Sequence, residues 1–431
     1  MAAIASFNID SFFITSSIAL NHTMDGAHDY HNFQLKLRQR PVWEQVKRYV
    51  RSQQAITRES SEQLAAPLQR MVPLSINLDL TTACNYRCDH CIDWDILNSR
   101  AKHHEKQLRD SLKELADGGM KSVILIGGGE PTIYPRFVEI VQYLKQLNQQ
   151  VAIVSNGSRG ERLLAACKFL KSADWIRLSL DAGTDETFQA MHKPSKPISL
   201  DEICEWVPRM KVANPDVQVG YSFIVTWRGA ARDQVTIVEN IDELIAAADR
   251  ARTFDFDYFS VKPFLVRQED NNAEVMNPNT AEESLDRVIA KIRSAVDEAK
   301  KLETDTFKIV ESTNLKLLEQ KSWQDYTCQP QRCHMQAFRQ VLTPLGLFNC
   351  PGYRGVPAAR IAGPAAYCDQ GATEITTQKT IDTIGRFDAS KQCANVTCLY
   401  NATNWWLQDL IDQPEKLDQV QVTDETTDFF L

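Results

Sequence analysis

The chain has 431 residues, of which 24% are charged and 43% hydrophobic, a balance typical of a globular protein with a large core. Its formal net charge of −8 argues against a general binder of nucleic acid or of anionic membranes. No apolar run reaches membrane-spanning length, and the first ten residues lack the basic region of an export signal. The eleven cysteines therefore predict a cytoplasmic protein that uses thiolates to bind metal.

Residues 1–72 are predicted to form a partly helical N-terminal leader, with a helix over 42–52. Its histidines, His22, His28 and His31, lack metal-ligand spacing, so we assign them no chemistry.

From residue 73 onward, strand patterns alternate with helix patterns. The predicted strands cover 74–80, 123–126, 151–154, 175–180, 217–226 and 256–262. The predicted helices cover 104–117, 136–147, 161–171, 201–212, 237–250 and 280–302. This alternation predicts an α/β fold with parallel strands and right-handed crossovers, in which binding groups gather at the carboxyl ends of the strands.

Three cysteines, Cys84, Cys88 and Cys91, follow the first predicted strand with the spacing C-x3-C-x2-C. Three thiolates in so short a loop can bind three irons of a four-iron cluster and leave the fourth iron open to a small molecule. A zinc site is the alternative, although zinc sites prefer pairs of C-x2-C or sets that mix cysteine and histidine.

This cysteine loop resembles the signature of the radical S-adenosylmethionine (SAM) superfamily, whose fold is a partial (β/α)6 barrel similar to a TIM barrel. Members usually carry an aromatic residue before the third cysteine, whereas this chain has His90, whose planar ring can still lie near an adenine. The resemblance covers residues 74–264 and implies a [4Fe–4S] cluster that binds SAM. The three cysteines of the loop would be its ligands.

Motifs after the second and third strands fit the same resemblance. Gly128, Gly129 and Glu130 belong to a Gly-Gly-Glu-Pro sequence, similar to the motif that binds the methionine amino group of SAM in the superfamily. Ser155 and Asn156 stand where members hold the ribose and carboxylate of SAM. Glycines after a strand often only form a turn, so the position of this motif one βα unit after the cysteine loop carries the assignment.

The fourth strand places Arg177, Ser179 and Asp181 on one face, in the run that resembles the fourth-strand pattern of the superfamily. The resemblance implies SAM contacts for Arg177 and Ser179, because an arginine can bind a carboxylate at two points. A buried salt bridge is the alternative for Arg177. Lys262, at the end of the sixth strand, is placed near the same site without an assigned role.

The region 306–431 follows the predicted barrel, 73–305, and is rich in cysteine, glycine and proline. It resembles a SPASM or twitch extension, in which a hairpin with a glycine at its turn presents a cysteine to an auxiliary [4Fe–4S] cluster. The resemblance supports Cys328, Cys333 and Cys350 as ligands, with Cys398, Cys393 or Cys368 as the fourth. The C-x2-C-x5-C-x3-C run of a full SPASM domain is absent, so one auxiliary cluster is predicted, with a structural zinc as the alternative. Cys167 and Cys204 lie in helical patterns and are predicted to be buried apolar residues.

The resemblance implies an oxidoreductase that cleaves SAM reductively and abstracts a hydrogen atom from a small-molecule or peptide substrate in a biosynthetic pathway. Flavodoxin or ferredoxin would supply the electron. An auxiliary cluster favours oxidation or oxidative bond formation, because it can accept the electron left on the substrate. Group transfer, such as methylation or thiolation, and a non-catalytic iron–sulfur scaffold remain the alternatives.

Overall fold

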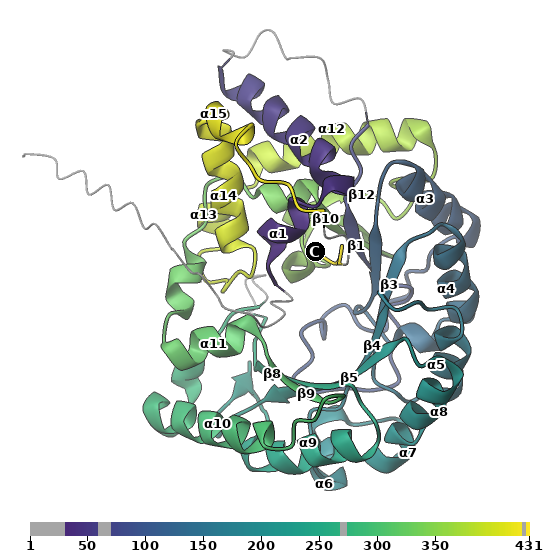
Figure 1. The fold of residues 1–431 in the computed structure, drawn as a ribbon, viewed down its shortest axis with the longest axis vertical. Coiled ribbons are helices and arrows are strands. Elements are labelled where there is room, and N and C mark those ends of the chain that lie inside the picture. The colour runs from purple at the N-terminus through teal and green to yellow at the C-terminus, as the bar shows by residue number, and fades with distance from the viewer. Residues whose placement is uncertain (1–30, 59–69, 268–273, 425–427) are drawn as a thin grey trace, which may run out of the picture.

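The computed structural model describes residues 31–58, 70–267, 274–424 and 428–431, and a curved ten-stranded sheet organises them (Figure 1). The strand order is β12-β11-β10-β1-β2-β3-β4-β5-β8-β9. Its strands are β1 (Ser75–Leu78), β2 (Ser122–Leu125), β3 (Gln150–Ser155), β4 (Trp175–Ser179), β5 (Gln218–Val225), β8 (Tyr258–Pro263), β9 (Lys308–Glu311), β10 (Arg339–Thr343), β11 (Gly346–Phe348) and β12 (Arg360–Ala362).

All six predicted strands form and pair in parallel, in the order β1, β2, β3, β4, β5 and β8. The parallel sheet then continues past the predicted boundary at residue 305, because β9 pairs with β8. On the opposite side β10 pairs in parallel with β1. The predicted hairpin forms between β10 and β11, with Gly346 directly after the two turn residues and paired with Thr343. A second, two-stranded sheet joins β6 (Ala231–Arg232) to β7 (Val235–Thr236).

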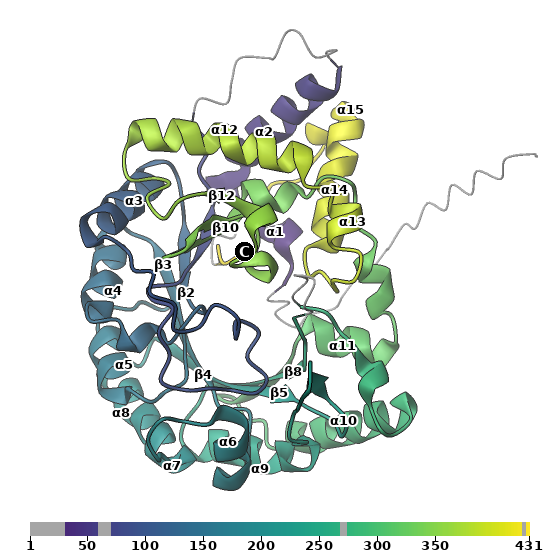
Figure 2. The same ribbon diagram turned by 180° about the vertical axis from the view of Figure 1, so that it is seen from behind.

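Helices cover the convex side of the sheet, as Figures 1 and 2 show. Those between barrel strands are α3 (Glu105–Asp117), α4 (Phe137–Gln146), α5 (Gly160–Cys167), α6 (Asp185–His192), α7 (Leu200–Cys204), α8 (Trp206–Ala213), α9 (Leu244–Thr253) and α10 (Leu285–Lys300). The helix predicted over 201–212 is thus two helices, and Pro208 lies in the first turn of the second, where its missing N–H costs no hydrogen bond. Cys167 and Cys204 are fully buried in these helices, as predicted.

Side chains alternate between the two faces of the sheet. Ile76 and Leu78 of β1 pack into the large core between sheet and helices, together with their counterparts on the other parallel strands. The concave face is more polar, since it carries Asn77 on β1 and Arg177 and Ser179 on β4. This face is where the predicted site residues meet.

The remaining helices belong to the two ends of the chain: α1 (Phe33–Leu37), α2 (Arg40–Arg58), α11 (Thr313–Gln320), α12 (Gln370–Arg386), α13 (Ala389–Gln392), α14 (Asn401–Asp412) and α15 (Pro414–Leu417). The predicted leader helix is confirmed as part of α2, while His22 and His28 lie outside the described residues. His31 is bonded to Thr313, with Nδ1 and Oγ1 2.9 Å apart.

The segment 428–431 enters the concave side of the sheet, where the label C stands in Figures 1 and 2. Phe430 packs on Ile124 and Ala152, and its ring meets that of Trp175 edge-on at 5.5 Å. Lys36 holds the segment from the leader through an ion pair with Asp428 at 2.9 Å. Helix α1 and the segment 428–431 thus contact each other through Lys36. Among the described helices, none is long and apolar enough to cross a membrane.

Candidate cluster and SAM site

The cysteine loop follows β1 and presents three half-buried thiols, those of Cys84, Cys88 and Cys91. Burial raises the pKa of Cys84 to about 11 and that of Cys91 to about 12, and it raises the pKa of Cys88 well above its usual value. Each thiolate would raise the pKa of its neighbours further, so a bound cation is what would keep the three sulfurs ionised together. This donor set fits an iron–sulfur cluster.

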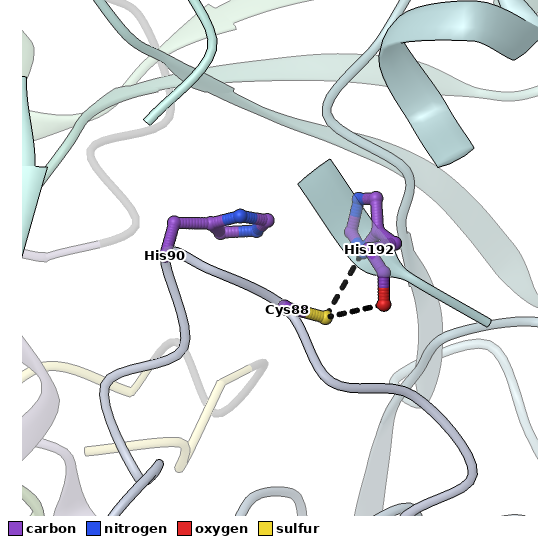
Figure 3. Close-up of side chains that lie close together, drawn as sticks. All are labelled: Cys88, His90 and His192. Carbon is purple, nitrogen blue, oxygen red and sulfur yellow. Dashed lines mark hydrogen bonds between the residues drawn. The ribbon is translucent and has the colours of Figure 1, made fainter. Parts of the chain in front are cut away.

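Figure 3 shows that Cys88 points toward His192, with His90 beside it. The ligand atoms of the three residues lie within 4.8 Å of one another. Nδ1 of His192 is 3.2 Å from the Cys88 sulfur, and its Nε2 is 3.0 Å from the carbonyl oxygen of Leu180. A carbonyl oxygen can only accept, so a neutral His192 carries its proton on Nε2. Its Nδ1 then accepts a hydrogen bond from the Cys88 thiol. The same three side chains could also hold a single metal ion.

Asp181 anchors both imidazoles. Its Oδ2 lies 3.0 Å from Nε2 of His90 and 3.4 Å from Nε2 of His192, while Oδ1 accepts the N–H of Ile224 at 2.7 Å. Burial would raise the pKa of Asp181, but the hydrogen bonds of the two histidines outweigh burial and lower it. His90 therefore keeps a fixed ring whose buried Nδ1 has no hydrogen-bond partner among the described residues.

The glycine loop packs directly against the cysteine loop. Gly129 lies so close that a Cβ placed on it would be 2.2 Å from the carbonyl oxygen of Ala83, the residue before the first cysteine. That same oxygen accepts the N–H of Glu130 at 2.9 Å. Gly128 has a φ of +63°, which a residue with a side chain rarely adopts. Only glycine fits this contact without displacing the loop that carries the thiols.

Glu130 joins the ends of β2 and β3. Its Oε1 accepts from the Ser155 hydroxyl at 2.7 Å, and its Oε2 accepts from the N–H of Asn156 at 2.8 Å. The Asn156 side chain in turn donates to Asn85, next to the first cysteine, at 3.0 Å. Burial raises the pKa of Glu130, although these hydrogen bonds oppose the shift. The structure therefore brings together the predicted residues of three strand ends around the cysteine loop.

Arg177 lies apart from this group. Ser155 pairs with Leu178 in the sheet, so Ser179 is level with Asn156, while Arg177 pairs with Val154, two residues nearer the amino ends of the strands. Its guanidinium leans further that way, onto the Trp175 ring at 5.1 Å. Arg177 forms no ion pair with a described residue, so the alternative of a buried salt bridge is not what the described structure shows.

A buried arginine that the sequence did not single out connects the two cysteine regions. Arg354, four residues after Cys350, contacts both oxygens of Asp93 at 2.8 and 2.7 Å and lies 2.8 Å from Asp79. Arg267 donates to the carbonyl of Arg354 at 3.2 Å. In the sequence, only the position of Asp93, two residues after the third cysteine of the loop, pointed to this contact.

The second group of thiols surrounds a cavity in the C-terminal region. Cys333, Cys350, Cys393 and Cys398 line it. Burial raises the pKa of Cys393 to about 12 and raises those of Cys350 and Cys398 well above the usual value, and each would be raised further by the other thiolates. The predicted ligands Cys333, Cys350 and Cys398 are thus brought together. Cys328 is exposed and does not line the cavity, whereas Cys393, one of the candidates for the fourth ligand, does.

This cavity reaches the concave face of the sheet through Arg339. Arg339 lines the cavity, and its guanidinium donates to Asn77 on the inner face of β1 at 2.8 Å. It is also bonded to the hydroxyl of Tyr400, another residue of the lining. The second thiol group therefore lies one side chain away from the barrel interior.

A parallel sheet with three thiols after its first strand and a glycine loop after its second defines a cluster-binding partial barrel. Residues 78–240 match the model of the radical SAM superfamily, and the chain carries a domain of that superfamily. The solved structure of native anSMEcpe with bound AdoMet shares the fold, with a TM-score of 0.50 and 14% identity, over 80% of this chain and 99% of that one.

Two curated relatives differ in what their names describe. An S-adenosylmethionine-dependent nucleotide dehydratase of Selenomonas ruminantium is 27% identical over 252 residues, which cover 55% of this chain and 89% of that protein. The mycofactocin maturase MftC of Mycobacterium ulcerans is 31% identical over 119 residues, which cover 28% of this chain and 32% of that protein. The similarity to MftC thus spans about a third of its length.

Proposed function

We propose that the protein is a radical SAM enzyme that cleaves SAM reductively and abstracts a hydrogen atom from a small-molecule or peptide substrate. The observation that carries this is the packing of the glycine loop on the cysteine loop, through Gly129 and the Ala83 carbonyl. In the superfamily a four-iron cluster held by such a loop supplies the electron that breaks a carbon–sulfur bond of SAM. Cys84, Cys88 and Cys91 would hold that cluster.

The contacts to SAM are proposed at the ends of β2, β3 and β4. Gly128 and Gly129 would expose backbone to the ligand, while Oε2 of Glu130, which accepts the N–H of Asn156, would also accept from the amino group of SAM. Asn156 and Ser179 stand level with each other on neighbouring strands, where the ribose and carboxylate would lie. Glu130, with Ser155 bonded to it, fixes the distance between these strand ends and so positions the ligand.

The second group of thiols supports an auxiliary cluster with four protein ligands, Cys333, Cys350, Cys393 and Cys398. Four cysteines satisfy all four irons, so the substrate would not bind to this cluster. Its role would be to accept the electron left on the substrate after hydrogen abstraction. This favours net oxidation, and Arg339 marks the side of the cavity that faces the substrate.

A nucleotide substrate and a peptide substrate are both open, because the relatives are named for a nucleotide dehydratase and for a maturase. Dehydration of a nucleotide would need no auxiliary acceptor, whereas the four thiols around one cavity favour an oxidative outcome. Group transfer is a lesser alternative, and it would give a methylated or sulfur-bearing product. A structural zinc would also fit four thiolates and would leave the protein without an internal electron acceptor.

The test is the iron and sulfide content of anaerobically reconstituted protein, with electron paramagnetic resonance spectra of the reduced protein with and without SAM. We expect about eight irons per chain, from two four-iron clusters, and one signal that SAM perturbs. About four irons would assign the C-terminal thiols to another metal. A protein that binds no iron would refute the proposed function.

A further inference from the structure

Two basic side chains, those of Arg177 and Lys262, lie on the concave face of the sheet. Arg177 on β4 is level with Gly220 of β5, and Lys262 on β8 is level with Ile224 of β5, so Ser222 lies between the two levels. We call Arg177, Ser222 and Lys262 the cationic layer. Nζ of Lys262 donates to the hydroxyl of Ser222 at 3.3 Å, and neither cation forms an ion pair with a residue in the described parts of the chain.

The nearest carboxylate does not neutralise the cationic layer. Asp181 is close enough to act on both cations, but its oxygens already accept from His90, His192 and the N–H of Ile224. Burial lowers the pKa of Lys262 well below its usual value, and the like charge of Arg177 lowers it further. Placing two like charges in a poorly solvated interior is unfavourable unless an anion joins them.

Aromatic rings lie on the amino-end side of Arg177. Its guanidinium lies on the Trp175 ring, and the ring of Phe430 meets that of Trp175 edge-on. Arg177 and Lys262 are both half-buried, and Lys262 lies nearer the carboxyl ends of the strands, the side on which the cysteine loop follows β1. Burial and the nearby charges of Lys36, Lys262 and Arg177 also lower the pKa of His31 to about 3.

We propose that the cationic layer binds an anionic group of the substrate, a phosphate or a carboxylate, and holds it beneath the SAM site. This rests on the proposed function, and it assigns Arg177 to the substrate rather than to SAM. The hydrogen atom to be abstracted would then lie on the part of the substrate between the anionic group and the cysteine loop. Because the whole chain has a net charge of −8, the two basic side chains of the cationic layer are a local feature of the barrel interior.

The test measures anion binding by calorimetry at low ionic strength, with reconstituted enzyme in the presence of SAM. Pyrophosphate and succinate are the two probes, and the tighter one shows whether phosphate or carboxylate is preferred. Lys262→Met should weaken binding of the preferred probe about tenfold or more, as expected for loss of one charge-assisted hydrogen bond. Lys262→Arg should restore most of the affinity.

Lys308→Met is the matched control, because Lys308 is an exposed cation on the neighbouring strand β9. Equal weakening in this control and in Lys262→Met, or no binding of either probe by the wild-type enzyme, would overturn the inference. Arg177→Met gives an independent variant, which should also weaken binding. The spectrum of the same wild-type sample with SAM separates the two hypotheses. A cluster that responds to SAM in a protein that binds no anion refutes only the cationic layer. The absence of such a cluster refutes the proposed function and the inference with it.

Discussion

Arg354 and Asp93 form a buried two-point contact, in which one guanidinium nitrogen lies 2.8 and 2.7 Å from the two carboxylate oxygens. Asp93 comes two residues after Cys91, and Arg354 comes four residues after Cys350. The pair therefore fixes the C-terminal thiol region against the cysteine loop. An electron that passes between two clusters depends on such a fixed separation.

We expect Arg354→Met to lower the free energy of unfolding by about 3–5 kcal/mol, because it leaves Asp79 without its cation and Asp93 with only the longer contact to Arg267 at 3.5 Å. Denaturant titration measures this. The control is Arg228→Met, which removes the side chain that pairs with Glu239 from an arginine 64% exposed, and the change there should stay below about 1 kcal/mol. Similar losses in both variants would show that the Arg354 contact contributes no more than a surface pair.

Substitution of single cysteines should distinguish the ligands of the auxiliary site. Cys393→Ala should remove the second set of about four irons while leaving the SAM-responsive signal, because Cys393 lines the cavity. Cys328→Ala should retain both clusters, since Cys328 is exposed and outside the cavity lining. Iron content and spectra decide the result, and the reverse outcome would restore Cys328 as the ligand.

Gly129→Ala should weaken SAM binding strongly, because the added methyl group would lie 2.2 Å from the Ala83 carbonyl and force the two loops apart. We expect the dissociation constant for SAM to rise about tenfold or more, the equivalent of about 1.4 kcal/mol. Gly363→Ala is the matched control, since a Cβ there meets no atom within 4 Å. Unchanged SAM affinity in Gly129→Ala would argue against the glycine loop as part of the site.

Protonation of His334 should make stability depend on pH. Its Nδ1 is 2.7 Å from the Tyr49 hydroxyl and its Nε2 is 3.1 Å from Gln408, and burial lowers its pKa to about 4. Between about pH 6.5 and pH 4 the unfolded chain binds this proton and the folded protein does not, so stability is full at pH 7 and falls with pH.

From pH 7 to pH 5 this site should cost about 2 kcal/mol of unfolding free energy. His334→Gln should reduce that dependence, as measured by denaturant titration at the two pH values. His104→Gln should leave it unchanged, because His104 is exposed. A wild-type slope retained in His334→Gln would assign the pH dependence to other groups.

The sequence predicted the barrel well because its strands direct apolar side chains toward the helices and are flanked by clear helix patterns. Ile76 and Leu78 show the alternation of a strand that covers a helical layer, and the structure confirms it. Motifs local to one loop, such as Gly128 to Glu130, could be found in the same way. Sequence pattern could not reveal that Glu130 spends its oxygens on Ser155 and Asn156, since this depends on how neighbouring strands align.

Residues brought together across long separations were beyond sequence reasoning. Cys393 was one of three candidates for the fourth ligand, and only the folded chain shows that it packs with Cys333 and Cys350 on one apolar cluster and lines the cavity. Cys328 had the better spacing to Cys333 but faces solvent. Arg354 carries no motif, and its partners Asp79 and Asp93 are distant in sequence.

The pairing of β1 with β10 has a consequence for synthesis of the chain. One edge of β1, residues 75–78, finds its partner only after residues 339–343 have left the ribosome. At about 5–20 residues per second, the wait is on the order of tens of seconds. During that time the strand that precedes the cysteine loop is an open edge, and iron delivered then would meet thiols that are not yet held in place. Loading of the clusters is therefore expected to follow completion of the chain.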